Sequence, residues 1–237
     1  MGMVVDTHPD HDFYQLFSEP ADLGFYGTAR NRTWVIGSHK ERTCLADPFE
    51  VYGSIKAHCS RLLRAEVSDY LIATSSELKL EETALALSRN MRSYIPGQTP
   101  AGYLLNPRES TTRAAMDEKY RAKFQLEPMD NKNLVYFLGD SSEYCSWSAT
   151  SQKIPTYRLN SKNGKYWLPH NQRLMTSKER LTSMGFPVSK EVAQAMAVPM
   201  MGATDCKRAG DILGNSMHFQ TSGIMQLLSL ACFGPLI

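Results

Sequence analysis

Two arginines stand directly before a run of β-prone residues. Arg30 and Arg32 precede residues 33–37, where four residues that favour strands end at a glycine, and this pattern predicts a buried strand. Two guanidinium groups at the start of a strand can converge on an anion or a carbonyl oxygen, because each presents a fork of N–H donors. A pair of solvated surface arginines explains the same residues, since short motifs are often false positives.

A second candidate site precedes the apolar C-terminal segment. Gly214, Asn215 and Ser216 are expected to form a loop that opens the last helix. Free backbone N–H groups at a helix start, together with two short polar side chains, suit a small polar ligand. An ordinary helix N-cap is the alternative, because Asn and Ser both cap well.

Basic residues flank a predicted hairpin, in which residues 156–159 and 165–168 pair across Asn163 and Gly164. Lys162, Lys165 and Arg173 could straddle a phosphate backbone. We therefore expect DNA contacts to concentrate between Ser110 and Arg173, and loss of Lys162 and Lys165 together to lower the salt slope by about 1.8. The expected surface also includes Arg113, Lys119, Arg121, Lys123, Tyr157 and Trp167. A solvated turn and a solvated helix are the alternative.

The N-terminus contains a cluster of residue types that bind metals, namely Asp6, His8, Asp10, His11 and Asp12. The remaining histidines have no neighbouring His or Asp at ligand spacing, so we expect a polar turn and no metal site. A metal-dependent hydrolase is kept as an alternative, which stoichiometric metal in the purified protein would support.

Composition limits the class of protein. The 237 residues are 42% hydrophobic and 21% charged, with a formal net charge of +2; these are the proportions of a globular protein, and the net charge alone does not argue for nucleic acid. The five cysteines form no C-x-x-C pair, which disfavours a disulfide framework or a zinc ribbon and indicates reduced thiols in an intracellular protein. The longest apolar run, residues 224–237, is shorter than the roughly 20 residues that span a bilayer, so we expect a buried helix and no membrane.

Local signals place several further elements. Thr74 and Glu77 form a capping box, and so do Thr176 and Glu179, whose helix is expected to end at Gly185. The predicted helices are 74–93, 110–126, 176–184, 189–198 and 217–233, and residues 134–138 are a predicted strand. The apolar stripes expected to face the core are Leu80, Ala84, Leu87 and Met91 in the first helix and Met217, Thr221, Ile224, Leu228 and Ala231 in the last.

Three of these segments occur in a fixed order that resembles the C-terminal portion of the DNA cytosine-5 methyltransferases. Residues 26–37 resemble the family's eighth motif, an R-x-R that leads into a strand. Residues 172–187 resemble the ninth, R-x-x-T-x-x-E followed by M-G-F-P, and residues 214–217 resemble the tenth, G-N-S-M. The family has a variable target-recognition region between its eighth and ninth motifs. This chain departs from the family at Thr28, where Gln is usual, and it contains no F-x-G-x-G, Pro-Cys or Glu-Asn-Val.

The resemblance implies an α/β fold: the C-terminal part of a Rossmann-like methyltransferase domain with an inserted mixed α+β target-recognition region. The implied divisions are residues 1–42, the end of the catalytic domain; 43–170, the recognition region; and 171–237, closing helices that return to the catalytic domain. By the same resemblance, Arg30 and Arg32 contact the flipped cytosine and the catalytic loop. Gly214, Asn215 and Ser216 border the S-adenosyl-L-methionine pocket, and Lys162, Lys165 and Arg173 contact double-stranded DNA.

Chemistry in this family resembles covalent catalysis, in which a thiolate adds to C6 of a flipped cytosine and C5 then attacks the donor methyl group. Because the Pro-Cys and Glu-Asn-Val motifs are missing, we expect the chain alone to be inactive. A truncation and one half of a split enzyme, whose partner chain supplies those motifs, both stay open. A non-catalytic DNA-binding module derived from the family is the alternative. The expected location is intracellular, and nuclear in a eukaryote.

Overall fold

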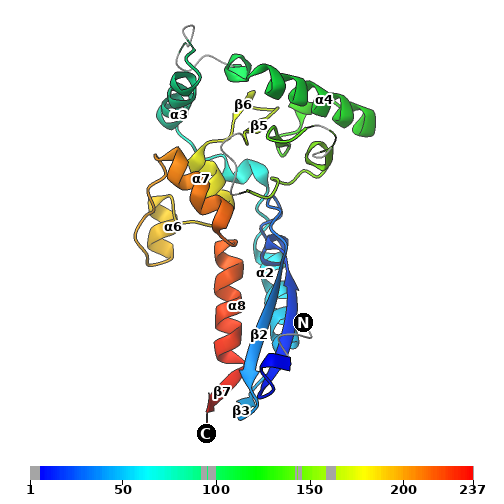
Figure 1. Cartoon of the computed structure of the whole chain (residues 1–237), viewed down its shortest axis with the longest axis vertical. Helices are drawn as coiled ribbons and strands as arrows, with labels where there is room; N and C mark the ends of the chain where they lie inside the picture. Colours follow the sequence, from blue (N-terminus) through cyan, green and yellow to red (C-terminus); the bar gives the residue numbers. More distant parts are fainter. Residues whose placement is uncertain are drawn as a thin grey trace. The chain divides into compact units, whose positions relative to one another are not determined.

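A computed structural model describes residues 6–91, 95, 100–141, 143, 146–158 and 164–236. The chain is mixed α and β, with helices α2 to α8 and small antiparallel sheets (Figure 1). It divides into two compact units: unit 1 comprises Met1–Phe25, Arg30–Arg64 and Met217–Ile237, and unit 2 comprises Tyr26–Ala29 and Ala65–Ser216. The domain boundaries predicted from the sequence lie after residue 42 and after residue 170. No helix among the described residues has both the length and the apolar character needed to cross a bilayer.

Unit 1 is built on a two-stranded antiparallel ribbon. Strand β1 (His11–Ser18) pairs with β2 (Arg32–His39), with Leu16 opposite Trp34 and Tyr14 opposite Ile36. Strand β2 was predicted, whereas β1 was not, because the metal-ligand types at its start were interpreted as a polar turn. The prediction that β2 is a buried strand holds for one face only: its exposure alternates, with Ile36 buried and Val35 half exposed, because a strand buries both faces only when both are covered.

The remaining elements of unit 1 cover one face of this ribbon. They are η1 (Pro20–Leu23), β3 (Arg42–Cys44), α2 (Pro48–Leu62), α8 (Phe219–Ala231) and β7 (Phe233–Leu236), and β3 pairs antiparallel with β7. Helix α2 was not predicted, although Asp47 accepts a hydrogen bond from the Phe49 backbone N–H at 2.8 Å and Pro48 occupies the first turn, which are ordinary start signals.

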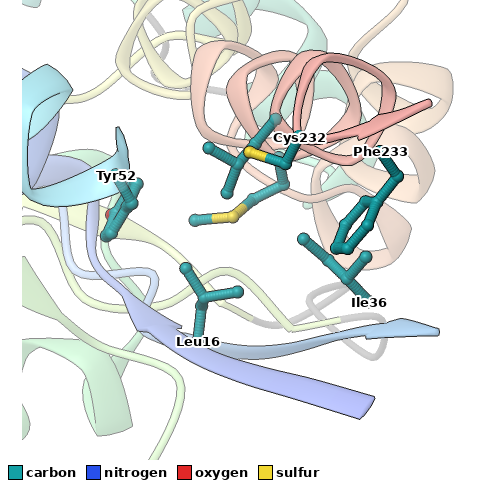
Figure 2. Packing of buried hydrophobic residues seen from close by; sticks show 7 residues of the cluster. Leu16, Ile36, Tyr52, Cys232 and Phe233 are labelled. Carbon is teal, nitrogen blue, oxygen red and sulfur yellow. The ribbon is translucent and has the colours of Figure 1, made fainter. Parts of the chain in front are cut away.

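One hydrophobic core joins the strands and helices of unit 1. Its buried residues come from β1, β2, α2, α8 and the start of β7: Leu16, Ile36, Tyr52, Met225, Leu228, Cys232 and Phe233. Figure 2 shows Ile36 beside Phe233 and Cys232. Burying a large apolar side chain stabilises a fold by about 1.5–3 kcal/mol. This core therefore holds the N-terminal ribbon to the C-terminal helix.

The predicted apolar stripe of the last helix is partly wrong. Helix α8 buries Thr221, Met225 and Leu228, and Ile224 packs against the same core, so three of the five expected positions face inward. Met217 precedes the helix and is 41% exposed. The helix is not buried all round, since Leu227 and Leu230 are 63% and 76% exposed. The chain leaves the helix at Cys232 and forms β7, which pairs with β3.

Unit 2 contains a three-stranded antiparallel sheet in the order β4 (Tyr136–Phe137), β5 (Tyr166–Leu168) and β6 (Arg173–Leu174). The predicted hairpin is wrong in its pairing. Strand β5 pairs with β4 on one side and with β6 on the other. Residues 156–158 form no strand, and the predicted turn residue Asn163 lies outside the described residues. The hairpin in the structure joins β5 to β6, with Gln172 at a positive φ of 49° in its loop.

Helices surround this sheet: α3 (Ser75–Ser88), α4 (Pro107–Phe124), α5 (Ser177–Ser183), α6 (Lys190–Ala195) and α7 (Cys206–Asn215), with short 3₁₀ turns η2 (Val67–Tyr70), η3 (Ala101–Leu104), η4 (Pro128–Asp130) and η5 (Ser146–Ala149). The capping boxes at Thr74 and Thr176 are confirmed. A third, at Asn106 with Glu109, starts α4 three residues before the predicted start.

The apolar stripe predicted for α3 is wrong at three of its four positions. Leu80 and Leu87 are 52% and 72% exposed and Ala84 is exposed, whereas Ala86 is buried with Ala101 and Leu104, and Met91 packs against them. The helix is held to α5 through polar groups: Glu77 binds Lys178 at 2.8 Å and Glu81 accepts from Ser177. These contacts decide which face of α3 points inward.

Candidate functional site

Arg30 and Arg32 both belong to unit 1, and they differ in exposure. Arg30 is 4% exposed, which makes it one of the few buried charged residues. Arg32 begins β2, and its guanidinium donates to the Asn31 carbonyl oxygen at 2.7 Å and to Met217 Sδ at 3.2 Å. Strand β2 therefore carries one buried and one half-exposed guanidinium at its start, close to where the chain enters α8.

The structure corrects the expectation for Gly214, Asn215 and Ser216. These residues end a helix and do not open one, because Gly214 and Asn215 are the last residues of α7 and Ser216 is its C-cap. The backbone N–H of Ser216 donates to the Ile212 carbonyl oxygen at 2.9 Å, and the Asn215 amide donates to that of Asp211 at 3.0 Å. The backbone donor of Ser216 is therefore used inside α7, and α8 starts only after His218.

The residues that resemble the ninth motif form a buried polar network in unit 2. Glu179 is fully buried and accepts two bonds from the Arg173 guanidinium, at 2.7 and 2.8 Å, and one from the Thr176 backbone N–H at 2.9 Å. The Ala73 backbone N–H also donates to it, at 3.4 Å. Arg173, a predicted DNA contact, is thus bound to Glu179 and only 13% exposed. The R-x-x-T-x-x-E pattern thus joins Arg173 of strand β6 to the N-terminal cap of helix α5.

The other predicted DNA contacts of the hairpin fall in different places. Lys162 lies outside the described residues. Lys165 is half-buried and lines a cavity of about 320 Å³ together with Glu81 and Arg180. Burial, followed by the charges of Arg180 and Arg89, lowers the pKa of Lys165. Lys165 is therefore part of a concave site.

The aromatic surface predicted beside these cations is absent from the described part of the chain, because Tyr157 and Trp167 are each 3% exposed. The Arg113 guanidinium covers the Trp167 ring at 5.3 Å. On the outer side of α4, Arg121 binds Glu127 at 2.8 Å and the Lys123 ammonium lies 5.1 Å from the Phe124 ring. The exposed basic surface of α4 thus includes Arg121 and Lys123.

Among the described residues, no group of three or more His, Cys, Asp and Glu side chains gathers as a metal site would require. Instead, the N-terminal histidines pack against aromatic rings. His11 stacks with Phe13 at 6.3 Å and meets His39 edge-on at 5.2 Å.

Sequence reasoning missed two buried features. Arg180 and Glu81 line the cavity with Lys165, yet they lie on α5 and α3, and no short motif links them. His218 is buried, shares a hydrogen bond of 3.1 Å with Thr221 Oγ1, and has a pKa lowered by burial to about 4. Its position directly before an apolar helix was the only sequence signal.

The comparisons with known proteins provide no assignment. No protein-family model matches the sequence, and a search of curated proteins found no match.

Proposed function

We propose that the chain is the C-terminal, DNA-recognising portion of a DNA cytosine-5 methyltransferase that acts with S-adenosyl-L-methionine on double-stranded DNA. The main observation in support of this proposal is which segments of the chain make up unit 1. Strand β2, which starts with Arg32, and helix α8 share one hydrophobic core although residues 65–216 lie between them. The resemblance requires this packing, because in the family the eighth motif and the last helix belong to the same catalytic domain.

The second support is the compactness of the intervening residues. Residues 65–216 form their own unit, with its own sheet and helices, as a recognition region inserted into another domain would. In this proposal unit 1 is the end of a Rossmann-like domain and unit 2 reads the DNA. Arg30 and Arg32 contact the flipped base, and Gly214, Asn215 and Ser216 border the methyl-donor pocket after the end of α7.

Catalysis in this proposal needs a second set of residues. The 237 residues contain no Pro-Cys and no Glu-Asn-Val, so a thiolate for C6 and an acid for N3 come from another polypeptide segment. The same observation favours a second candidate, a non-catalytic DNA-binding module derived from the family. Titration of S-adenosyl-L-methionine into the protein–duplex complex separates the two: the methyltransferase portion has only part of the donor pocket, so it should bind the donor weakly and Asn215→Ala should weaken this binding further, whereas the module shows none.

Both candidates require duplex binding, which a salt titration tests. Phosphate contacts release counterions, so the logarithm of the binding constant falls with the logarithm of salt concentration. Lys119 and Lys123 are four residues apart on α4 and therefore share a face. Their replacement together by Gln is expected to reduce the slope by about 1.8, the value for two lost phosphate contacts.

The matched control is the double variant Lys79→Gln, Lys190→Gln, which removes two exposed lysines of unit 2 outside residues 110–173. It should leave the slope unchanged. Folded protein that shows no salt-dependent duplex binding contradicts the proposed function. An unchanged slope in the Lys119→Gln, Lys123→Gln variant would place the interface outside α4, and an equal loss in both double variants would show that the contacts are not specific to α4.

A further inference from the structure

Five elements of unit 2 line a cavity of about 320 Å³ that the proposed function does not use. Helices α3, α5 and α7 and strands β5 and β6 each contribute to its walls. One wall is apolar and includes Leu78, Leu85 and Leu174, and the rest is polar and includes Lys165, Arg180 and Asp211. Its volume falls within the usual range for small-molecule sites, about 300–1,000 Å³, and the mixture of one apolar wall and a few polar groups is typical of them.

Two cations in this cavity have donors without acceptors. The Lys165 ammonium has no hydrogen bond and no ion pair with any part of the chain that the structure describes. Arg180 donates from Nη2 to Ser177 Oγ at 2.9 Å, but its Nε is shielded from solvent and has no partner within the described ranges. Buried donors in folded proteins are almost always paired, so the buried Nε of Arg180, beside the half-buried ammonium of Lys165, indicates a missing acceptor.

Two of the carboxylates near these cations, Glu81 and Glu109, are engaged by other donors, whereas Glu82 and Asp211 line the cavity. Glu81 accepts from the backbone N–H and the hydroxyl of Ser177, at 2.6 and 3.2 Å, and burial raises its pKa. Glu109 is bound by Arg89 through two bonds of 2.8 and 2.9 Å. Burial lowers the pKa of Lys165 most, and the positive charges of Arg180 and Arg89 lower it further.

We propose that this cavity binds a small phosphate-bearing ligand with an aromatic or apolar body, of the size of a mononucleotide. Phosphate oxygens would accept from Lys165 and from Arg180 Nε, because charge-assisted bonds of this kind are strong. A flat ring would lie against Leu78, Leu85 and Leu174. The Asp211 carboxylate would accept from an amino or hydroxyl group of the ligand.

The test is calorimetric titration of the full chain with deoxycytidine monophosphate, with deoxycytidine as the phosphate-free probe. The monophosphate should bind at least tenfold more tightly, equivalent to about 1.4 kcal/mol, and it should raise the melting temperature. Equal affinity for the two probes, or no binding of either, overturns the proposal. So does competitive displacement of the monophosphate by duplex DNA, which would assign the cavity to the DNA interface.

Variants locate the site. Lys165→Gln and Arg180→Gln should each weaken binding of the monophosphate at least tenfold, while Lys132→Gln, which removes an exposed lysine away from the cavity, should change it less than twofold. Lys165→Gln removes no hydrogen bond within the part of the chain that the structure describes, so it keeps the test valid if Arg180→Gln fails to fold. Unchanged affinity in folded Lys165→Gln overturns the proposal.

Discussion

Two arginine–glutamate pairs of unit 2 have the same spacing and opposite burial, which allows the cost of burial to be measured. Arg173 binds Glu179 and Arg121 binds Glu127, each pair six residues apart and each through more than one hydrogen bond. The side chains of the first pair are 13% and 0% exposed, and those of the second are 50% and 54% exposed.

Arg173→Met should destabilise the protein far more than Arg121→Met. Removing one partner of a buried pair leaves an uncompensated charge and costs about 3–5 kcal/mol, whereas an exposed pair contributes little because water screens its charges. At about 2–4 °C per kcal/mol for a domain of 150–250 residues, Arg173→Met should lower the melting temperature by about 6–20 °C. Arg121→Met should lower it by less than about 4 °C.

Scanning calorimetry of both variants measures the difference. A third variant, Arg173→Met with Glu179→Gln, removes the unpaired charge while keeping an acceptor for the Thr176 backbone N–H. It should recover part of the loss, because the buried carboxylate is the costly group. Equal destabilisation by Arg173→Met and Arg121→Met would refute the reasoning, since burial would then have no influence on the value of the pair.

Three further predictions concern other parts of the molecule. Gly24→Ala should destabilise unit 1 by about 1–3 kcal/mol, because Gly24 has a φ of +89° and a Cβ would lie 2.3 Å from the Leu63 carbonyl oxygen. Gly53→Ala, in open space on α2, should instead stabilise it by about 0.5–1 kcal/mol. Denaturant titrations that rank the two variants the other way would contradict this prediction. Burial lowers the pKa of His218 to about 4, below its ordinary value near 6.5, so the unfolded chain binds the proton more tightly and the free energy of unfolding should fall by about 3 kcal/mol as pH drops from 6.5 to 4. His218→Gln should flatten this part of a stability–pH profile. An equally steep profile in that variant would count against the prediction. Burial raises the thiol pKa of Cys206 and of Cys232. Alkylation of the native protein, mapped by mass spectrometry, should therefore modify the exposed Cys44 at least roughly tenfold faster than either of these two thiols. Comparable rates for Cys44 and Cys206 would show that Cys206 is accessible.

The features that the sequence determined by itself are local. The capping boxes at Thr74 and Thr176 were predicted because each joins a side chain to a backbone N–H only three residues away. The same locality explains why the end of α5 was predicted at Gly185, whose φ is +78°. Strand β2 was predicted from its β-prone residues, because that preference does not depend on its partner.

Tertiary structure alone decided which face of each element is buried and which residues meet. The face of α3 is set by Glu77 and Glu81 binding α5, and an apolar stripe cannot reveal a helix that docks through carboxylates. Strand β5 pairs with β4 and β6 and not with the segment nearest in sequence. Lys165, Arg180 and Glu81 share a cavity although they come from three separate elements. Contacts of this kind depend on how distant segments pack, and local spacing carries no information about them.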